Sequence, residues 1–174
     1  MTKPTWDEIF LTVAETIKLR STCIRRQVGA VLVSHYLLPD IVSFGYNGTP
    51  SGTPNCNEGG CSRCASTTIA SGEGYDQENC IHAEDNSILM AARRGVPTTG
   101  TVLYVTARPC LLCLKVIIQA GITKVIYRVT DTVNQLGMPI MAGPVLAPDQ
   151  VVMVQSSGLS IFKYVDGQCI PDSP

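Results

Sequence analysis

The chain has 174 residues, 45% of them hydrophobic, and a formal net charge of -1. This is enough apolar material for one domain with a buried core, and the balanced charge excludes the broad positive surface that attracts nucleic acid. Because the apolar runs are too short to cross a bilayer and residues 1–10 lack a signal-peptide core, we expect a cytoplasmic protein with no membrane partner.

The N-terminal half contains one strong helical pattern and two short extended runs. Apolar residues at positions 6, 9, 10, 13, 14 and 17 fall on one side of a helix. Two β-branched runs, separated by a turn that contains Pro39 and Asp40, predict an antiparallel hairpin. The stretch that follows is dense in Gly, Ser, Thr, Asn and Cys, and an ordered loop of that length needs something to hold it. The expected elements are a helix from Trp6, strands over 28–34 and 41–45, and a cysteine-rich loop insertion over about 46–80.

The C-terminal half alternates helices with strands. Gly95 and Pro97 end the first of these helices, and Gly121 closes the second. The expected elements are helices over 81–92 and 110–120, strands over 101–106, 124–129 and 159–165, and a stretch at 149–158 whose periodicity does not distinguish helix from strand. This order predicts the α/β class, as one domain over residues 1–174 with helices on both faces of a central mixed sheet of about five strands.

Two motifs at helix starts indicate metal chemistry. His82 and Glu84 stand in HAEDNSI, and Cys110 and Cys113 stand in RPCLLC. Taken singly, His-x-Glu is common on protein surfaces, and the cysteine pair also suits a redox dithiol or two core residues. Together they supply three zinc ligands and leave one position for a water molecule, which zinc activates at neutral pH. Glu84, two residues from His82, is then placed to carry protons.

These motifs resemble those of the cytidine/deoxycytidylate deaminase superfamily. The likeness runs from about Arg20 to Val129 and rests on RSTCIRRQVGAVLV, GYNGTPSG, HAEDNSI and TARPCLLC, of which GYNGTPSG is characteristic of the deoxycytidylate (dCMP) deaminase branch. The resemblance implies a three-layer α/β/α cytidine deaminase-like fold and zinc-dependent hydrolysis of dCMP to dUMP and ammonia, which supplies dUMP for thymidylate synthesis. It further implies that Glu84 is the proton shuttle, that backbone near Ala83 holds the cytosine O2, and that Asn47 contacts the nucleoside.

The six cysteines that remain of the eight include a second candidate metal site. Cys61 and Cys64 have zinc-knuckle spacing, Cys56 precedes them closely, and Cys23 stands before the hairpin that leads into the loop. Four thiolates form a closed structural zinc site that orders the loop, while free thiols or a disulfide are the alternatives. By resemblance, Cys23 and Cys56 align with ligands of a second zinc in some dCMP deaminases. Cys80 is assigned to neither site.

A nucleotide substrate also requires cations at its phosphate. Arg25, Arg26, Tyr127 and Arg128 are the candidates, because the family places its phosphate contacts in such segments and the guanidinium group binds phosphate through two hydrogen bonds. Solvated surface charge is the alternative for each arginine. The resemblance further implies a homohexamer, with activation by dCTP and inhibition by dTTP, each bound with Mg2+.

Three other functions remain open on the sequence. The first is a related deaminase that acts on dCTP, on a 5-substituted dCMP or on a nucleoside. The second is a zinc-stabilised binding module without chemistry, against which the presence of Glu84 beside three ligands argues. The third is a polynucleotide deaminase, which the near-neutral charge and the lack of a basic, aromatic-lined groove disfavour. Ammonia release from a panel of cytosine nucleotides discriminates among them.

Overall fold

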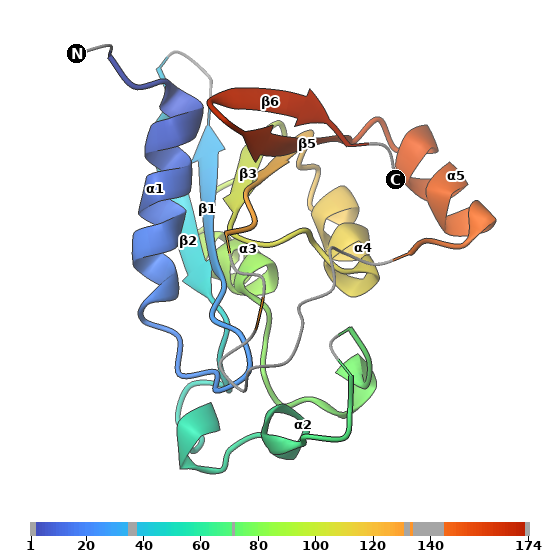
Figure 1. The fold of residues 1–174 in the computed structure, drawn as a ribbon. Coiled ribbons are helices and arrows are strands. Elements are labelled where there is room, and N and C mark those ends of the chain that lie inside the picture. The colour runs from blue at the N-terminus through green and yellow to red at the C-terminus, as the bar shows by residue number, and fades with distance from the viewer. Residues whose placement is uncertain (1–2, 35–37, 71, 131–132, 134–144, 173–174) are drawn as a thin grey trace.

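The structure is a computed structural model that describes residues 3–34, 38–70, 72–130, 133 and 145–172 (Figure 1). Its helices are α1 (Trp6–Lys18), α2 (Ser62–Ala65), α3 (Ala83–Arg93), α4 (Leu111–Gln119) and α5 (Pro148–Ser156), with short 3-10 turns η1 (Cys56–Glu58) and η2 (Tyr75–Gln77). The strands are β1 (Gly29–Ser34), β2 (Asp40–Tyr46), β3 (Val102–Val105), β4 (Lys124–Tyr127), β5 (Ser160–Val165) and β6 (Gln168–Pro171). No helix in the described part of the chain is long and apolar enough to cross a membrane.

Among the described residues, the six strands form one mixed sheet in the order β2-β1-β3-β4-β5-β6. The pairs β3–β4 and β4–β5 are parallel, and the other three pairs are antiparallel. The α/β class and the mixed sheet are confirmed, with one strand more than the five expected. The additional strand is β6, whose sequence QCIP has no alternating pattern and ends in proline, a residue that strands admit only at edges. The stretch 149–158, left open by periodicity, lies mostly in helix α5.

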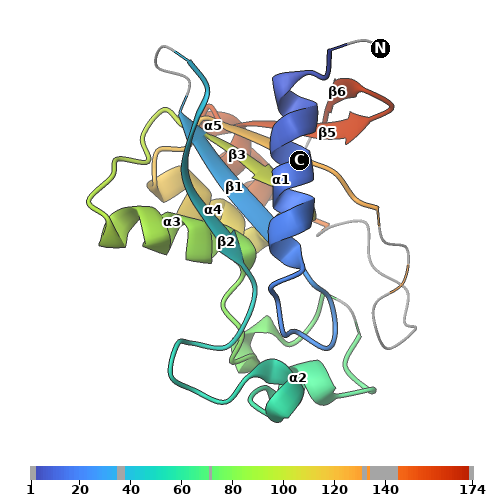
Figure 2. The ribbon, with the colours of Figure 1, turned by 90° about the vertical axis from the view of Figure 1, so that its left-hand side faces the viewer.

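Helix α1 covers one face of the sheet, as Figures 1 and 2 show from two sides. The side chain of Thr5 caps it by accepting a hydrogen bond from the Glu8 N–H at 3.2 Å. Its apolar side then packs on alternate residues of the strands, which point to the same face because side chains in a strand have a period of two. This half of the core contains Phe10, Leu11, Ala14, Val31, Val33, Tyr104 and Ile126.

Helices α3, α4 and α5 pack on the opposite face. The intervening residues of β1, Ala30 and Leu32, are fully buried there, so this strand is covered on both sides. This half of the core contains Ala83, Ala91, Leu103, Val105, Leu114, Ile117, Val125, Val154 and Ile161. The two halves together make the three layers, helix, sheet and helix, that the sequence predicts.

The loops that carry the sequence motifs gather at one end of the sheet. The strand register pairs Gly29 with Tyr46 and Ala30 with Val105, so the start of β1 lies beside the ends of β2 and β3. Thr106, just after β3, accepts a hydrogen bond from the Gly29 N–H through its Oγ1 at 3.1 Å. The segments before β1, after β2 and after β3 are therefore neighbours, although up to about 80 residues of chain separate them.

The cysteine-rich segment lies beyond this end of the sheet (Figure 1). Its two ends are joined by an antiparallel bridge, in which Gly48 N donates to Ile81 O at 3.1 Å and Ile81 N donates to Gly48 O at 2.8 Å. Between them the described residues contain only η1, α2 and η2, so few of the backbone hydrogen bonds of this segment are made within regular structure. Residues 35–37 of the expected hairpin turn lie outside the described residues.

Gly45 permits the close packing of α3 on β2, and its replacement tests this contact. A Cβ at Gly45 would lie 2.3 Å from Ala83 O and 2.4 Å from Ser87 N, both backbone atoms of α3. We expect Gly45→Ala to lower the free energy of unfolding by about 1–3 kcal/mol in urea denaturation, because α3 must move. Gly48→Ala, where a Cβ meets no atom within 4 Å, is the control. Equal stability of the two variants would contradict this account of the packing.

Candidate metal centre and cleft

The N-termini of α3 and α4 bring His82, Cys110 and Cys113 together. His82 is the N-cap residue of α3 and Cys110 that of α4, so both helices begin at the same end of the sheet. The Nδ1 atom of His82 lies 3.2 Å from Cys113 Sγ and 3.5 Å from Cys110 Sγ. One potential ligand atom from each of the three residues lies within 4.8 Å of the others. The structure thus gathers the three residues that the sequence analysis assigned to one metal ion.

The chemistry of this group fits zinc. One imidazole nitrogen and two thiol sulfurs form a donor set that zinc prefers, and both sulfurs are largely buried. The hydrogen bond from Cys113, opposed by burial, and the bond to His82 lower the pKa of the Cys110 thiol to about 4. Burial disfavours the charged form of His82, but its bonds to Cys110 and Glu78 raise the pKa of His82 to about 12. The Cys110 thiolate and the charged His82 ring therefore stabilise each other, while the bond with Cys110 raises the pKa of the Cys113 thiol.

Glu84 lies in the first turn of α3 and is 3% exposed. Burial raises the pKa of Glu84 to about 7, an effect that the charge on His82 opposes. A carboxyl group that titrates near neutrality can both accept and donate a proton at the pH of the cell. The position of Glu84 in the same cleft as His82 and Cys110 suits it to proton transfer at that site.

The cleft contains most of the predicted substrate-binding residues. His82, Glu84 and Cys110 line it together with Arg25, Arg26, Asn47, Ala83 and Arg108. Asn47 is buried, and its side-chain amide holds the segment before β1: Oδ1 accepts from Val28 N at 2.8 Å, and Nδ2 donates to Arg26 O at 2.8 Å. Asn47 therefore fixes the wall of the cleft that carries the two arginines.

Arg25 is a buried cation on that wall, with 3% of its surface exposed. Its Nη2 donates to Ser66 O at 3.2 Å and also to Ile69 O. Its Nε and Nη1 atoms are buried and have no hydrogen-bond partner among the described residues. Buried donors of a charged group are costly when unpaired, so these two N–H groups favour an anionic ligand in the cleft.

Two of the predicted phosphate contacts, Tyr127 and Arg128, are not brought to the cleft. Arg128 Nη1 lies 3.0 Å from Glu8 Oε1, on helix α1, and the Tyr127 hydroxyl donates to Asp172 Oδ2 at 2.9 Å. Neither residue is among those that line the cleft. The end of β4 faces α1 and β6 instead, an arrangement that depends on strand order and so is not visible in the sequence.

Arg108 lines the cleft although the sequence analysis did not select it. Its Nε lies 2.8 Å from Asp172 Oδ2. The available signal was its place two residues before Cys110, in the loop between β3 and α4, which the register brings to the same end of the sheet as His82.

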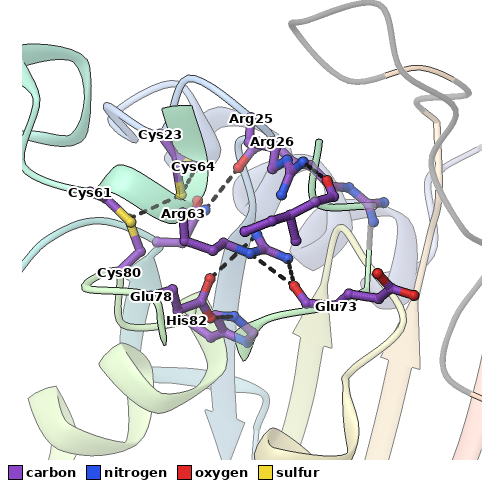
Figure 3. Close-up of polar contacts among 12 residues, drawn as sticks. Cys23, Arg25, Arg26, Cys61, Arg63, Cys64, Glu73, Glu78, Cys80 and His82 are labelled. Carbon is purple, nitrogen blue, oxygen red and sulfur yellow. Dashed lines mark hydrogen bonds and ion pairs between the residues drawn. The ribbon is translucent and has the colours of Figure 1, made fainter. Parts of the chain in front are cut away.

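A second cysteine cluster joins the segment before β1 to the loop segment, and three of its members, Cys23, Cys64 and Cys80, also line the cleft (Figure 3). Its members are Cys23, Cys56, Cys64 and Cys80, whose sulfur atoms all lie within 4.8 Å of one another and which are all buried. Cys64 Sγ is 3.7 Å from Cys23 Sγ and 3.8 Å from Cys80 Sγ. The cysteines form no disulfide. A four-thiol cluster without disulfides matches the donor set of a closed zinc site.

This set differs from the predicted one, because Cys80 takes the place assigned to Cys61. The Gly48–Ile81 bridge holds Ile81, and with it the preceding Cys80, near the end of β2. Cys80 Sγ there lies 3.8 Å from Cys64 Sγ. Cys61 is buried next to the cluster, where its sulfur accepts a hydrogen bond from Asn79 N at 3.4 Å. Spacing along the chain favoured Cys61, whereas the non-local bridge that positions Cys80 has no sequence signal.

The chain is similar in sequence to known deaminases. A family model described as the cytidine and deoxycytidylate deaminase zinc-binding region matches residues 4–129. A deoxycytidylate deaminase of Schizosaccharomyces pombe is 42% identical over 163 residues, which are 94% of this chain and 45% of that protein. The chain thus spans less than half the length of this relative. A deoxycytidylate deaminase of Mycobacterium phage D29 is 37% identical over 131 residues, covering 73% of this chain and 97% of the phage protein.

A solved structure has the same architecture. The dCMP deaminase of cyanophage S-TIM5, in complex with dCMP and dUMP, superimposes with a TM-score of 0.64 at 28% sequence identity. The match covers 94% of this chain and 100% of the phage chain.

Proposed function

The chain belongs to the cytidine and deoxycytidylate deaminase family, and on that premise we propose that it converts dCMP and water to dUMP and ammonia. The observation that carries the proposal is the buried Glu84 in one cleft with His82, Cys110 and the buried guanidinium of Arg25. The likeness to a phage dCMP deaminase whose complex holds dCMP and dUMP supports the same substrate.

The proposed chemistry divides between a metal ion and the chain. His82, Cys110 and Cys113 would hold a zinc ion, which would supply Lewis-acid activation of water at neutral pH. The Glu84 carboxylate accepts a proton from the attacking water and returns protons to the ring N3 and to the departing amino group. The oxygen of this water bonds to C4 as N3 takes one proton, and the C4–N bond then breaks as the amino group takes a second proton and leaves as ammonia. The N–H groups in the first turn of α3, which have no acceptor within the helix, face the place of the cytosine O2 near Ala83.

Substrate choice depends on the wall of the cleft. The two unpaired donors of Arg25 supply a charged contact for the 5'-phosphate, and Arg26 lies beside them on the same wall. Guanidinium groups bind phosphate with charge-assisted hydrogen bonds that a nucleoside lacks. Asn47 takes part by holding the Val28 and Arg26 backbone, and its own place in the cleft leaves it next to the nucleoside.

The proposal includes a second zinc ion, bound by Cys23, Cys56, Cys64 and Cys80. Four buried sulfur atoms within 4.8 Å of one another support this site. Without a cation, a thiolate on one cysteine makes it unfavourable for its neighbours to lose their protons. Hydrogen bonds from Cys64 and Cys80 lower the pKa of Cys23 and leave the pKa of both donors raised. A divalent cation would stabilise all four thiolates at once. It would also join the segment before β1, which carries Cys23, to Cys56, Cys64 and Cys80 of the loop segment.

Glu84→Gln tests the proton shuttle. The amide keeps the size of the side chain but cannot carry the proton, so we expect kcat for ammonia release to fall by about 10²–10⁴-fold with zinc content unchanged. Glu73→Gln, at an exposed position, is the control and keeps full turnover. A Glu84→Gln protein with normal turnover would refute the role of Glu84.

Arg25→Gln tests the phosphate contact. We expect kcat/KM for dCMP to fall by about 10–100-fold, as loss of one charged hydrogen-bonding group predicts, and kcat/KM for deoxycytidine to change little. Arg94→Gln, exposed at the end of α3, is the control. The assay compares dCMP, a 5-substituted dCMP and deoxycytidine, each with and without dCTP and Mg2+. Equal wild-type turnover of dCMP and deoxycytidine would overturn the proposed preference.

Cys80→Ser tests the second zinc ion against the set predicted from spacing. We expect metal analysis to find about two zinc ions per chain in the wild type and about one in Cys80→Ser, because serine is a poor ligand in a thiolate site. Cys61→Ser retains about two. A wild-type value near one, or equal loss in both variants, would contradict the assignment.

A further inference from the structure

The carboxylate of Glu78 lies between His82 and Arg63, outside the metal-ligand set (Figure 3). Its Oε1 is 2.6 Å from His82 Nε2, and its Oε2 is 3.5 Å from Arg63 Nη1. The side chains of Glu78 and Arg63 are 8% and 6% exposed. This buried charged pair is in direct contact with the only histidine of the metal centre.

The two nitrogens of His82 face different partners. Because Nδ1 faces the sulfurs of Cys110 and Cys113, a bound metal takes Nδ1 and leaves the hydrogen on Nε2. The Nε2–H group then donates to the Glu78 carboxylate at 2.6 Å. Such a bond fixes the tautomer and the ring plane, and it increases the basicity of the nitrogen that binds the metal.

We propose that Glu78 is a positioning residue for the metal centre, acting through His82, and that Arg63 holds Glu78 in place. The inference rests on the proposed function, because it concerns the ion that His82 binds there. It assigns a role in positioning the metal centre to two residues of the cysteine-rich loop that lie outside the proposed ligand set.

Arg63 is well suited to this role because its own position is fixed on several sides. Its Nε and Nη2 donate to the backbone oxygen of Glu73 at 3.0 and 2.5 Å. Its guanidinium lies over the ring of Tyr75, 4.8 Å from the centroid, and that ring packs edge-on against His82 at 5.1 Å. The third nitrogen of the guanidinium, Nη1, is the one that lies 3.5 Å from Glu78 Oε2.

The second cysteine cluster anchors both ends of this contact chain. Arg63 is adjacent to Cys64, and His82 follows Cys80 by two residues. A loop held by these two cysteines keeps Arg63 and His82 at a fixed separation, with Glu78 between them. The cysteine-rich segment thus has a place in the metal centre as well as in the fold.

Glu78→Gln is the test, with Glu73→Gln as the matched control, because Glu73 meets Arg63 only through a backbone oxygen that the substitution leaves unchanged. The readout is the 15N and 1H resonances of the His82 ring in zinc-loaded protein. The chain has only two histidines, so His35→Gln assigns the signals. Titration with a chelator, followed at the metal-bound Nδ1 resonance, gives the affinity of this site alone.

We expect wild type and Glu73→Gln to show a metal-bound Nδ1 and a protected Nε2–H. In Glu78→Gln the Nε2–H exchanges faster and the site loses zinc affinity by about 10–100-fold. Should that variant fail to fold, Glu78→Asp, which keeps the charge on a shorter side chain, is expected to show the same change in smaller measure. If a folded Glu78 variant has the same His82 resonances and the same zinc affinity as Glu73→Gln, the role of Glu78 is refuted and the proposed function is unaffected. Absence of a metal-bound Nδ1 signal in the wild type overturns the proposed function as well.

Discussion

The contact of one imidazole nitrogen with two thiol sulfurs is the interaction on which the rest of this structure depends. It requires the first turns of α3 and α4 to start within a few ångströms of each other, and each start is set by packing elsewhere. Helix α3 lies against β2 where Gly45 admits its backbone, and α4 follows β3 after a short loop. The antiparallel register of β1 with β2 and β3 then brings the remaining loops to the same place.

The cleft is built largely from buried charged groups that would be unfavourable in isolation. Glu84, Arg25, Arg63 and Glu78 are each largely buried, and burial of an uncompensated charge destabilises a folded chain. Arg63 and Glu78 compensate each other and His82, whereas Arg25 retains buried donors without a partner among the described residues. A site in which Arg25 has buried donors without a partner among the described residues, and in which burial raises the pKa of Glu84 to about 7, is suited to bind an anion and to move a proton. The same groups therefore limit stability and provide function.

Much of this could be predicted from local sequence. The apolar stripe of α1, the hairpin, and the alternation of strands and helices after residue 81 depend on patterns within one element, and each is present in the structure. The sequence also predicts that His82, Cys110 and Cys113 share a site. Each motif stands at the start of a helix, and both helices are expected to begin at the same end of the sheet.

The remainder depends on contacts between distant segments. The exchange of Cys61 for Cys80 follows from a single backbone bridge, Gly48–Ile81, that no spacing rule includes. Arg128 was predicted at the phosphate and Arg108 was not selected, although both follow a strand. Only the strand order shows that Arg128 lies at α1 and Arg108 at the cleft. Glu78 carries no motif of its own, and its contact with His82 depends on the course of an irregular loop.

The proposed function requires two separate groups of side chains to bind metal ions, one beside Glu84 and one that includes cysteines of the cysteine-rich loop. Anomalous diffraction from crystals of zinc-loaded protein, measured on both sides of the zinc absorption edge, tests it most directly. We expect two peaks, one in contact with His82 Nδ1 and the sulfurs of Cys110 and Cys113, the other among Cys23, Cys56, Cys64 and Cys80. A structure with no peak at His82, or with Cys110 joined to Cys113 in a disulfide, would contradict it.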